Sequence, residues 1–90
     1  MALYVVEHRL PGMTESDLTL LTAALEASSE RLARRGRKVR YLRSTYLPGQ
    51  GRLLCWYEAA SQEIVRTVIE SAQAPYVSLD AAIEVVSPQR

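Results

Sequence analysis

The residues of this chain best suited to chemistry lie on two segments that have the composition of β-strands. The single histidine, His8, follows Glu7 within residues 3–10, and the single cysteine, Cys55, precedes Glu58 within residues 52–59. A buried carboxylate or imidazole costs several kcal/mol unless it is paired or neutralised. Strands that only filled a core would not need these groups. We therefore expect at least one face of the sheet to do more than pack.

His8 and Glu7 are the candidates for proton transfer or metal binding. Imidazole has an ordinary pKa near neutrality, so His8 can act as a general base or a metal ligand. Glu7 can act as a base or hold a cation if it points between sheet and helices. One histidine cannot build a nitrogen-rich metal site alone, so carboxylates or a symmetry-related copy would have to complete it. The simpler alternatives are an interfacial or surface His8 with one hydrogen bond, and Glu58 ion-paired with Arg40.

Cys55 and the aromatic side chains are the candidates for ligand binding. Cys55 could be a nucleophile, with Arg43 as the group that lowers its pKa, although strand cysteines are usually buried and inert. The chain has no phenylalanine, so every aromatic residue except Trp56 carries a hydroxyl. Trp56, Tyr41, Tyr46 and Tyr57 could therefore line a pocket for an oxygenated or aromatic ligand. The alternative is that these rings fill the core or a dimer seam.

Composition excludes several classes of protein. The 90 residues predict one domain, residues 1–90, and the net charge of +1 gives no general attraction to nucleic acid or anionic membrane. We interpret the basic segment 31–40 as a solvated helix end rather than a nucleic-acid surface. One cysteine excludes an intrachain disulfide, and neither a membrane span nor a secretory signal is visible. The expected location is cytoplasmic.

Turn and capping residues divide the chain into six elements. Pro11 and Gly12 are typical of a turn, and Thr14 and Ser61 have the side chains and positions of helix N-caps. The expected elements are strands at residues 3–10, 39–46, 52–59 and 82–86, a first helix ending near Gly36, a second helix closed by Pro75, and a tail at residues 87–90.

The order β-α-β-β-α-β predicts an α+β, ferredoxin-like fold. Right-handed crossovers would place both helices on one face of a four-stranded antiparallel sheet and leave the other face bare. A bare face that carries Leu, Trp, Val and Tyr is too apolar for water. We therefore expect two copies to pair these faces as a homodimer.

Strand alternation assigns residues to the two faces. A five-residue loop, 47–51, would set Tyr46 opposite Arg52 and make Arg40–Glu58 a cross-strand ion pair. The same register would place Leu42 beside Trp56. It would also group four candidate site residues on one face: Tyr41, Arg43, Cys55 and Tyr57.

Three short motifs occur together: Tyr4-Val-Val-Glu7-His-Arg-Leu10-Pro11-Gly12, Tyr41-Leu-Arg43-Ser44-Thr-Tyr46, and Cys55-Trp-Tyr57-Glu58-Ala59. In this order the chain resembles a bacterial family of small uncharacterised domains that includes an actinobacterial nickel-binding protein. The resemblance implies a ferredoxin-like protomer that dimerises into an α+β barrel, and nickel held by His8 with carboxylates such as Glu7, across the dimer if needed. The family positions carried over are Glu7, Pro11, Gly12, Arg43, Ser44, Tyr46, Cys55, Tyr57 and Glu58. The family's usual Trp before Leu-Arg-Ser is Tyr41 here.

We expect a homodimeric α+β-barrel protein with a pocket between the sheet and the helices. The pocket would bind a small ligand or a divalent metal, and nickel is the metal that the resemblance implies. Glu7 and His8 would bind the metal or move a proton, with Tyr57 as a hydrogen-bond donor. Tyr41, Arg43, Cys55 and Trp56 would contact the ligand. The runner-up is a cofactor-independent isomerase, cyclase or monooxygenase of secondary metabolism, because the same barrel architecture hosts such enzymes. A third possibility is a non-catalytic interaction module whose sheet docks a partner.

Overall fold

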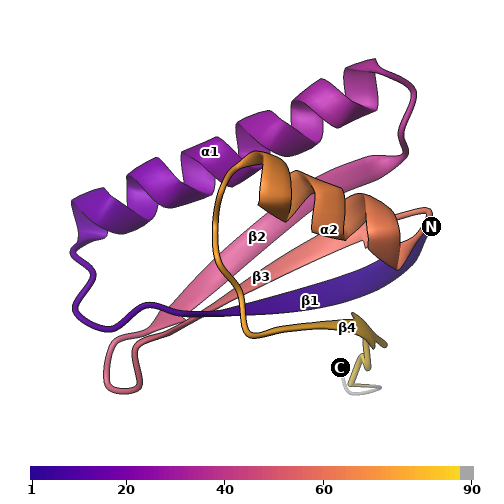
Figure 1. The fold of residues 1–90 in the computed structure, drawn as a ribbon. Coiled ribbons are helices and arrows are strands. Elements are labelled where there is room, and N and C mark those ends of the chain that lie inside the picture. The colour runs from indigo at the N-terminus through magenta and orange to yellow at the C-terminus, as the bar shows by residue number, and fades with distance from the viewer. Residues whose placement is uncertain (88–90) are drawn as a thin grey trace.

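Six elements make up the structure, which is a computed structural model that describes residues 1–87 (Figure 1). The elements in chain order are β1 (Ala2–Arg9), α1 (Glu15–Arg34), β2 (Val39–Leu47), β3 (Arg52–Ala59), α2 (Gln62–Ser71) and β4 (Ser78–Ala82). The tail expected at residues 87–90 lies, from residue 88 on, outside the described part of the chain.

The strands form one antiparallel sheet in the order β2-β3-β1-β4. Both helices pack on the same side of it (Figure 1). We call this side the helix face and the opposite side the open face. The order and the one-sided helices confirm the predicted α+β, ferredoxin-like fold.

Both helices begin at the predicted caps. The Thr14 hydroxyl accepts a hydrogen bond from the backbone N–H of Asp17, and the Asp17 carboxylate accepts one from the Thr14 N–H. This reciprocal pair satisfies two amide groups that the first helical turn leaves free. The Ser61 hydroxyl caps α2 through the Ile64 N–H. Gly36, at φ 87°, ends α1 in a conformation that glycine adopts without a steric penalty.

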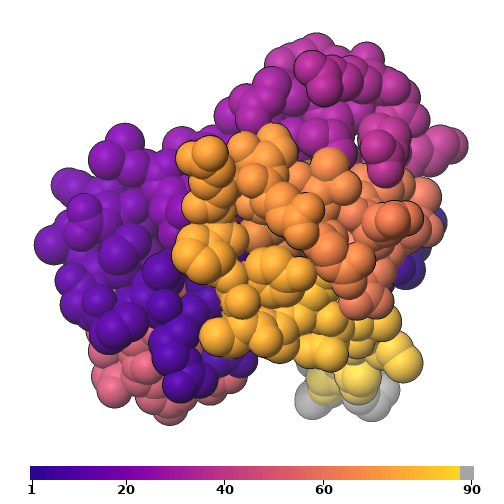
Figure 2. All heavy atoms as spheres, in the orientation of Figure 1, coloured from indigo at the N-terminus to yellow at the C-terminus, as the bar shows by residue number. Residues whose placement is uncertain are grey.

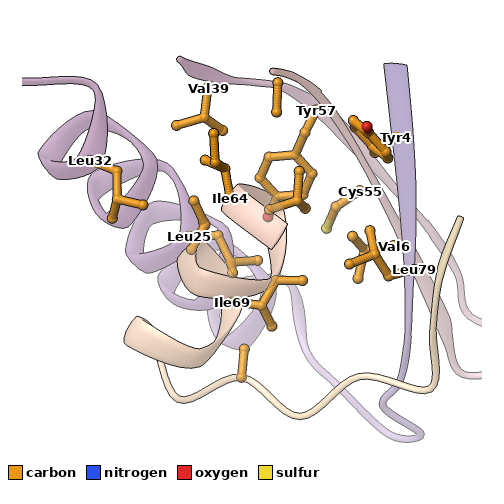
Figure 3. Close-up of a cluster of buried hydrophobic side chains, with 14 of the residues drawn as sticks. Tyr4, Val6, Leu25, Leu32, Val39, Cys55, Tyr57, Ile64, Ile69 and Leu79 are labelled. Atoms are coloured by element: carbon orange, nitrogen blue, oxygen red, sulfur yellow. The ribbon is translucent and has the colours of Figure 1, made fainter. Parts of the chain in front are cut away.

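The core fills the space between the helix face and the two helices. Figure 3 shows Cys55 and Tyr57 of β3 pointing from the sheet toward Leu25 of α1 and Ile69 of α2. Each of these four side chains is completely buried. Alternate residues of β1 and β3 are buried, as expected for strands with one covered face.

The last strand was predicted at residues 82–86, and this prediction was wrong. β4 lies four residues earlier, where Leu79 is buried on the helix face opposite Val6. A hydrogen bond from the Val77 N–H to the Glu7 carbonyl fixes the start of this pairing. Residues 83–86 follow outside any strand.

The β2–β3 hairpin departs from the predicted register at one point. Arg40 lies opposite Glu58, as predicted, but Leu42 has no partner and Arg43 pairs with Trp56. This β-bulge shifts every later pair by one residue, so Tyr46 faces Leu53 and not Arg52. A bulge reverses the faces of the residues that follow it.

Candidate functional site

A cluster of hydroxyl and thiol side chains lies on the helix face of β2 and β3. Tyr41 pairs with Tyr57 before the bulge, and Ser44 pairs with Cys55 after it. Because the bulge lies between these two pairs, all four side chains point to the same side of the sheet. We call these residues the hydroxyl–thiol cluster.

Three members of the cluster are linked by hydrogen bonds. The hydroxyls of Tyr41 and Ser44 share one, and the Ser44 hydroxyl donates to the Cys55 Sγ at 2.9 Å. The rings of Tyr41 and Tyr57 meet edge to face, with centroids 5.4 Å apart and an interplanar angle of 71°. This is a favourable aromatic geometry, and it fixes the position of the Tyr57 ring.

The fourth member, Tyr57, has a hydroxyl that is fully buried and has no hydrogen-bond partner among residues 1–87. Such a group keeps the full cost of its lost hydration. Figure 3 shows the Tyr57 oxygen pointing into the space between the sheet and the helices. Buried hydroxyls without a partner are rare in folded proteins, and each calls for an explanation such as a functional role or a bound water or ion.

The cluster is uncharged near neutral pH. Burial raises the pKa of Cys55 to about 11, only partly offset by the Ser44 hydrogen bond. Burial likewise raises the pKa of Tyr57 and, less strongly, that of Tyr41. The thiol and the phenols therefore stay protonated, so they are hydrogen-bond donors and not nucleophiles or bases.

Two hollows along the gap between α1 and β2 reach this cluster. The first, about 290 Å³, is lined by Tyr41 together with Glu26, Ser29, Glu30, Ala33, Val39 and Arg40. The second, about 260 Å³, is lined by Ser44 together with Glu15, Leu18, Thr19, Thr22, Tyr46 and Leu53. We call these two hollows the α1–β2 groove. Tyr41 and Ser44 border this groove, whereas Tyr57 and Cys55 lie behind them and line neither hollow.

His8 is completely buried on the same helix face. Its Nδ1 lies 2.8 Å from the Pro75 carbonyl oxygen, so Nδ1 must carry the proton that this bond requires. Nε2 then has a lone pair, and no residue of 1–87 contacts it as a hydrogen-bond partner. Burial lowers the pKa of His8, although the Pro75 bond opposes the effect. The neutral imidazole has the form in which histidine binds metals.

Glu7 lies on the open face, away from His8. The Arg52 guanidinium donates two hydrogen bonds to its carboxylate, at 2.9 and 3.1 Å, and Arg9 lies 3.8 Å away. The Arg52 hydrogen bonds lower the pKa of Glu7. Adjacent strand residues point to opposite faces, so the structure does not bring Glu7 and His8 together. Within the described 87 residues, no three His, Cys, Asp or Glu side chains are grouped closely enough to hold a metal ion.

Arg43 and Trp56 also lie on the open face. The guanidinium carbon of Arg43 is 4.7 Å from the centre of the Trp56 ring, a cation–π contact. The grouping of Arg43 with Cys55, and of Leu42 with Trp56, was therefore wrong, and the bulge is the reason. The Arg40–Glu58 ion pair was predicted correctly and measures 2.9 Å.

Ser44 is the cluster member that sequence reasoning did not select. Alternation alone placed it on the face opposite Tyr41, and only the bulge reverses this. Its place next to Arg43 in the second family motif was the signal available for it.

Comparison with known proteins places this geometry in a family. The structure is similar to the crystal structure of SCO4226 from Streptomyces coelicolor A3(2), with a TM-score of 0.81 and 22% sequence identity over 94% of this chain and 100% of that chain. At this identity the likeness shows the fold. No curated protein matches the chain. In the part that the structure describes, no helix is long and apolar enough to cross a membrane. The model of a family described as "Nickel responsive protein SCO4226-like" matches residues 4–81, which confirms the resemblance carried by the three motifs. The chain therefore belongs to the SCO4226-like family of nickel responsive proteins.

Proposed function

We propose that this protein binds a small, neutral, oxygen-bearing ligand at the hydroxyl–thiol cluster, between the sheet and the helices. The buried, unpartnered hydroxyl of Tyr57 is the observation that carries the proposal. A ligand carbonyl or hydroxyl oxygen that accepts a hydrogen bond from Tyr57 would remove the cost of leaving this donor unpaired.

The surroundings of the cluster favour a neutral ligand over an anionic one. Glu15, Glu26 and Glu30 line the α1–β2 groove, with Arg40 as the one cation there. Carboxylates at an entrance repel anions. The cluster itself offers only protonated donors, so it complements an acceptor atom without a full charge.

The same chemistry favours binding over catalysis. No carboxylate or imidazole within residues 1–87 is hydrogen-bonded to the cluster, and the raised pKa of Cys55, about 11, disfavours a thiolate. Acid–base catalysis needs a group whose pKa lies near the working pH. The cofactor-independent isomerase, cyclase or monooxygenase thus remains the less favoured alternative.

Benzamide and benzoate form a matched pair of probes for this proposal, because they share a ring and differ in charge. We expect benzamide to raise the melting temperature of the wild-type protein and to shift the amide NMR signals of β2 and β3, with a weaker response to benzoate. Y57F should lose the benzamide response, whereas Y76F, which changes a tyrosine outside the cluster, should keep it. An equal benzamide response in Y57F, or a stronger response to benzoate, would overturn the proposal.

A divalent metal, nickel, is the second candidate, favoured by the neutral His8 with its unpartnered Nε2. The described residues of one chain supply this imidazole but no complete set of donors, so they fit a nickel ion only in part. Further donors would have to come from water or from a second copy of the chain.

The metal candidate can be tested with Ni²⁺ alone, on protein from which any histidine tag has been removed. Nickel binding through His8 predicts a nickel-dependent rise in melting temperature that H8N abolishes. Asparagine can still bond to the Pro75 carbonyl but lacks the metal-binding nitrogen. E7Q serves as the control on the opposite face. A response that survives in H8N would exclude His8 as a ligand.

A further inference from the structure

More than half of the positive side chains of this protein lie in one short stretch, at the end of α1 and the start of β2. Residues 31–40 contain six of the eleven Lys and Arg residues: Arg31, Arg34, Arg35, Arg37, Lys38 and Arg40. The same ten residues include no Asp or Glu. Figure 2 shows the end of α1 projecting at the upper right of the molecule. Because the net charge of the whole chain is only +1, positive charge is concentrated at this end of the fold.

Five of these six cations form no ion pair with a residue of 1–87. The exception is Arg40, whose guanidinium lies 2.9 Å from the Glu58 carboxylate. Neighbouring positive charges repel one another, and the carbonyls at the end of a helix offset this repulsion only for cations in its last turn. Arg37 and Lys38 lie beyond the last turn of α1. Their charges therefore have no counterpart in the described part of the chain.

A hollow lies where α1 ends and β2 begins, and we call it the basic hollow. Its volume is about 480 Å³, within the roughly 300–1,000 Å³ that is usual for small-molecule pockets. It is lined by Met1, Ala33, Gly36, Arg37, Lys38, Val39 and Arg40. Figure 1 shows that the N-terminus and the turn after α1 lie at the same end of the molecule. The basic hollow therefore combines three apolar side chains with three cations.

We propose that the basic hollow binds a small organic anion with an apolar body, of the class of free carboxylic acids with a short hydrocarbon chain. The carboxylate would accept charge-assisted hydrogen bonds from Arg37 and Lys38, which supplies the missing counterpart to their charges. The hydrocarbon chain would lie against Met1, Ala33 and Val39 and lose its contact with water. Each part of such a ligand thus matches a different part of the hollow.

The composition of this region favours a free small molecule over a nucleic acid or a membrane. Single-stranded nucleic acids are bound by cations together with aromatic side chains on which the bases stack, and residues 31–40 contain no aromatic residue. A helix that binds a membrane surface presents large apolar side chains to the lipid. The exposed residues at the end of α1 are Arg31, Ala33 and Arg34, and none of these has a large apolar side chain.

The basic hollow adjoins the α1–β2 groove but differs from it in charge. Three residues line both the basic hollow and the first hollow of the groove: Ala33, Val39 and Arg40. The groove adds the carboxylates of Glu26 and Glu30, whereas the basic hollow adds Arg37 and Lys38. Clustered charges of one sign attract ligands of the opposite sign and repel those of the same sign. An anion is therefore favoured at this end of the gap and disfavoured nearer Tyr41.

Three probes separate the contribution of the charge from that of the chain. Octanoate has both, octanol lacks the charge, and acetate lacks the chain. The amide NMR signals of Gly36, Arg37 and Lys38, followed during titrations at constant ionic strength, give the Kd of each probe. We expect octanoate to bind at least about tenfold more tightly than octanol or acetate, and its affinity to fall as salt is added. Binding of octanol or acetate as tight as that of octanoate would overturn the proposal.

Substitutions then assign the binding to the hollow. R37Q/K38Q should weaken octanoate binding by about tenfold or more, because it removes both partners of the carboxylate. R34Q/R35Q is the matched control: it removes the same charge from the same stretch, at positions that do not line the basic hollow, and should change the affinity much less. A33L leaves every charge in place but fills the hollow from an exposed position, so it should also weaken binding. Circular dichroism of each variant shows whether it is folded.

Two results would refute the assignment. One is an R37Q/K38Q protein that binds octanoate as tightly as R34Q/R35Q does. The other is a wild-type protein that sediments with phosphatidylglycerol vesicles but does not bind free octanoate, which would make the basic stretch a membrane contact. Tyr57 does not line the basic hollow, and different amide signals report on the two sites. Failure of this proposal is therefore distinguishable from failure of the benzamide experiment.

Discussion

The buried Tyr57 hydroxyl leads to a prediction that runs against the usual effect of a core substitution. Y57F removes one oxygen and leaves the ring between Tyr41 and the helices. A buried hydroxyl without a partner costs about 1–3 kcal/mol relative to its hydrated state. Phenylalanine avoids this cost, so we expect the ligand-free variant to be more stable than the wild type by about 1 kcal/mol.

The expected shift is measurable by thermal and urea unfolding. An unfolding entropy of about 2.1 cal/mol/K per residue gives roughly 0.2 kcal/mol/K for a chain of this length, so 1 kcal/mol corresponds to about 5 °C in melting temperature. Y41F is the matched control, because the Tyr41 hydroxyl is bonded to Ser44. It should lower stability by about 1 kcal/mol.

The two tyrosine variants should therefore change stability in opposite directions. A Y57F protein that is less stable than the wild type by 1 kcal/mol or more would show that the hydroxyl has a partner in solution. That result would contradict the prediction that the Tyr57 hydroxyl is a donor without a partner. If Y57F is more stable than the wild type and has lost the benzamide response, the Tyr57 hydroxyl lowers the stability of the free protein and is needed for binding. Such a trade-off is common at functional sites.

Three further predictions concern other parts of the fold. Burial holds the pKa of His8 below 6.5, so the unfolded chain takes up the proton first. Stability should then fall as the pH drops through about 6.5, and H8N should remove this part of the pH dependence in urea unfolding. G51A should lower the free energy of unfolding by about 2 kcal/mol or more, because the added Cβ, at φ 62°, would lie 2.8 Å from the Pro11 Cα. G12A is the control, since Gly12 has a similar φ of 74° but lies in open space, and it should cost only about 1 kcal/mol. Deletion of Leu42 should remove the bulge yet keep the face of every other β2 residue, giving a folded protein by circular dichroism.

Local sequence signals were sufficient for most of the fold. The Thr14 and Ser61 caps act on amides within three residues of themselves, so their effect can be read without knowledge of the tertiary structure. Strand alternation depends only on the backbone and correctly placed Glu7 and His8 on opposite faces. The predicted order of strands and helices, with right-handed crossovers, then correctly placed both helices on one face of the sheet.

The position of β4 depends on contacts that sequence reasoning could not anticipate. Residues 82–86 have a strand-forming composition with Ile83, Val85 and Val86, whereas residues 78–82 contain no β-branched or aromatic side chain. The choice between them is made by the link after α2, where the Pro75 carbonyl bonds to His8 and the Val77 N–H bonds to Glu7. These contacts join residues nearly seventy positions apart.

The bulge at Leu42 assigns two neighbouring residues, Arg43 and Ser44, to opposite faces of the sheet. In a regular hairpin Arg43 would lie opposite Cys55, inside the core, where an unpaired guanidinium is very costly. Ser44 would lie opposite Leu54 on the open face, far from Tyr41. The extra residue sends the cation out to Trp56 and brings the serine hydroxyl in to the thiol. One irregularity in strand pairing therefore lets a single short strand place a cation on the open face and a hydroxyl in the interior.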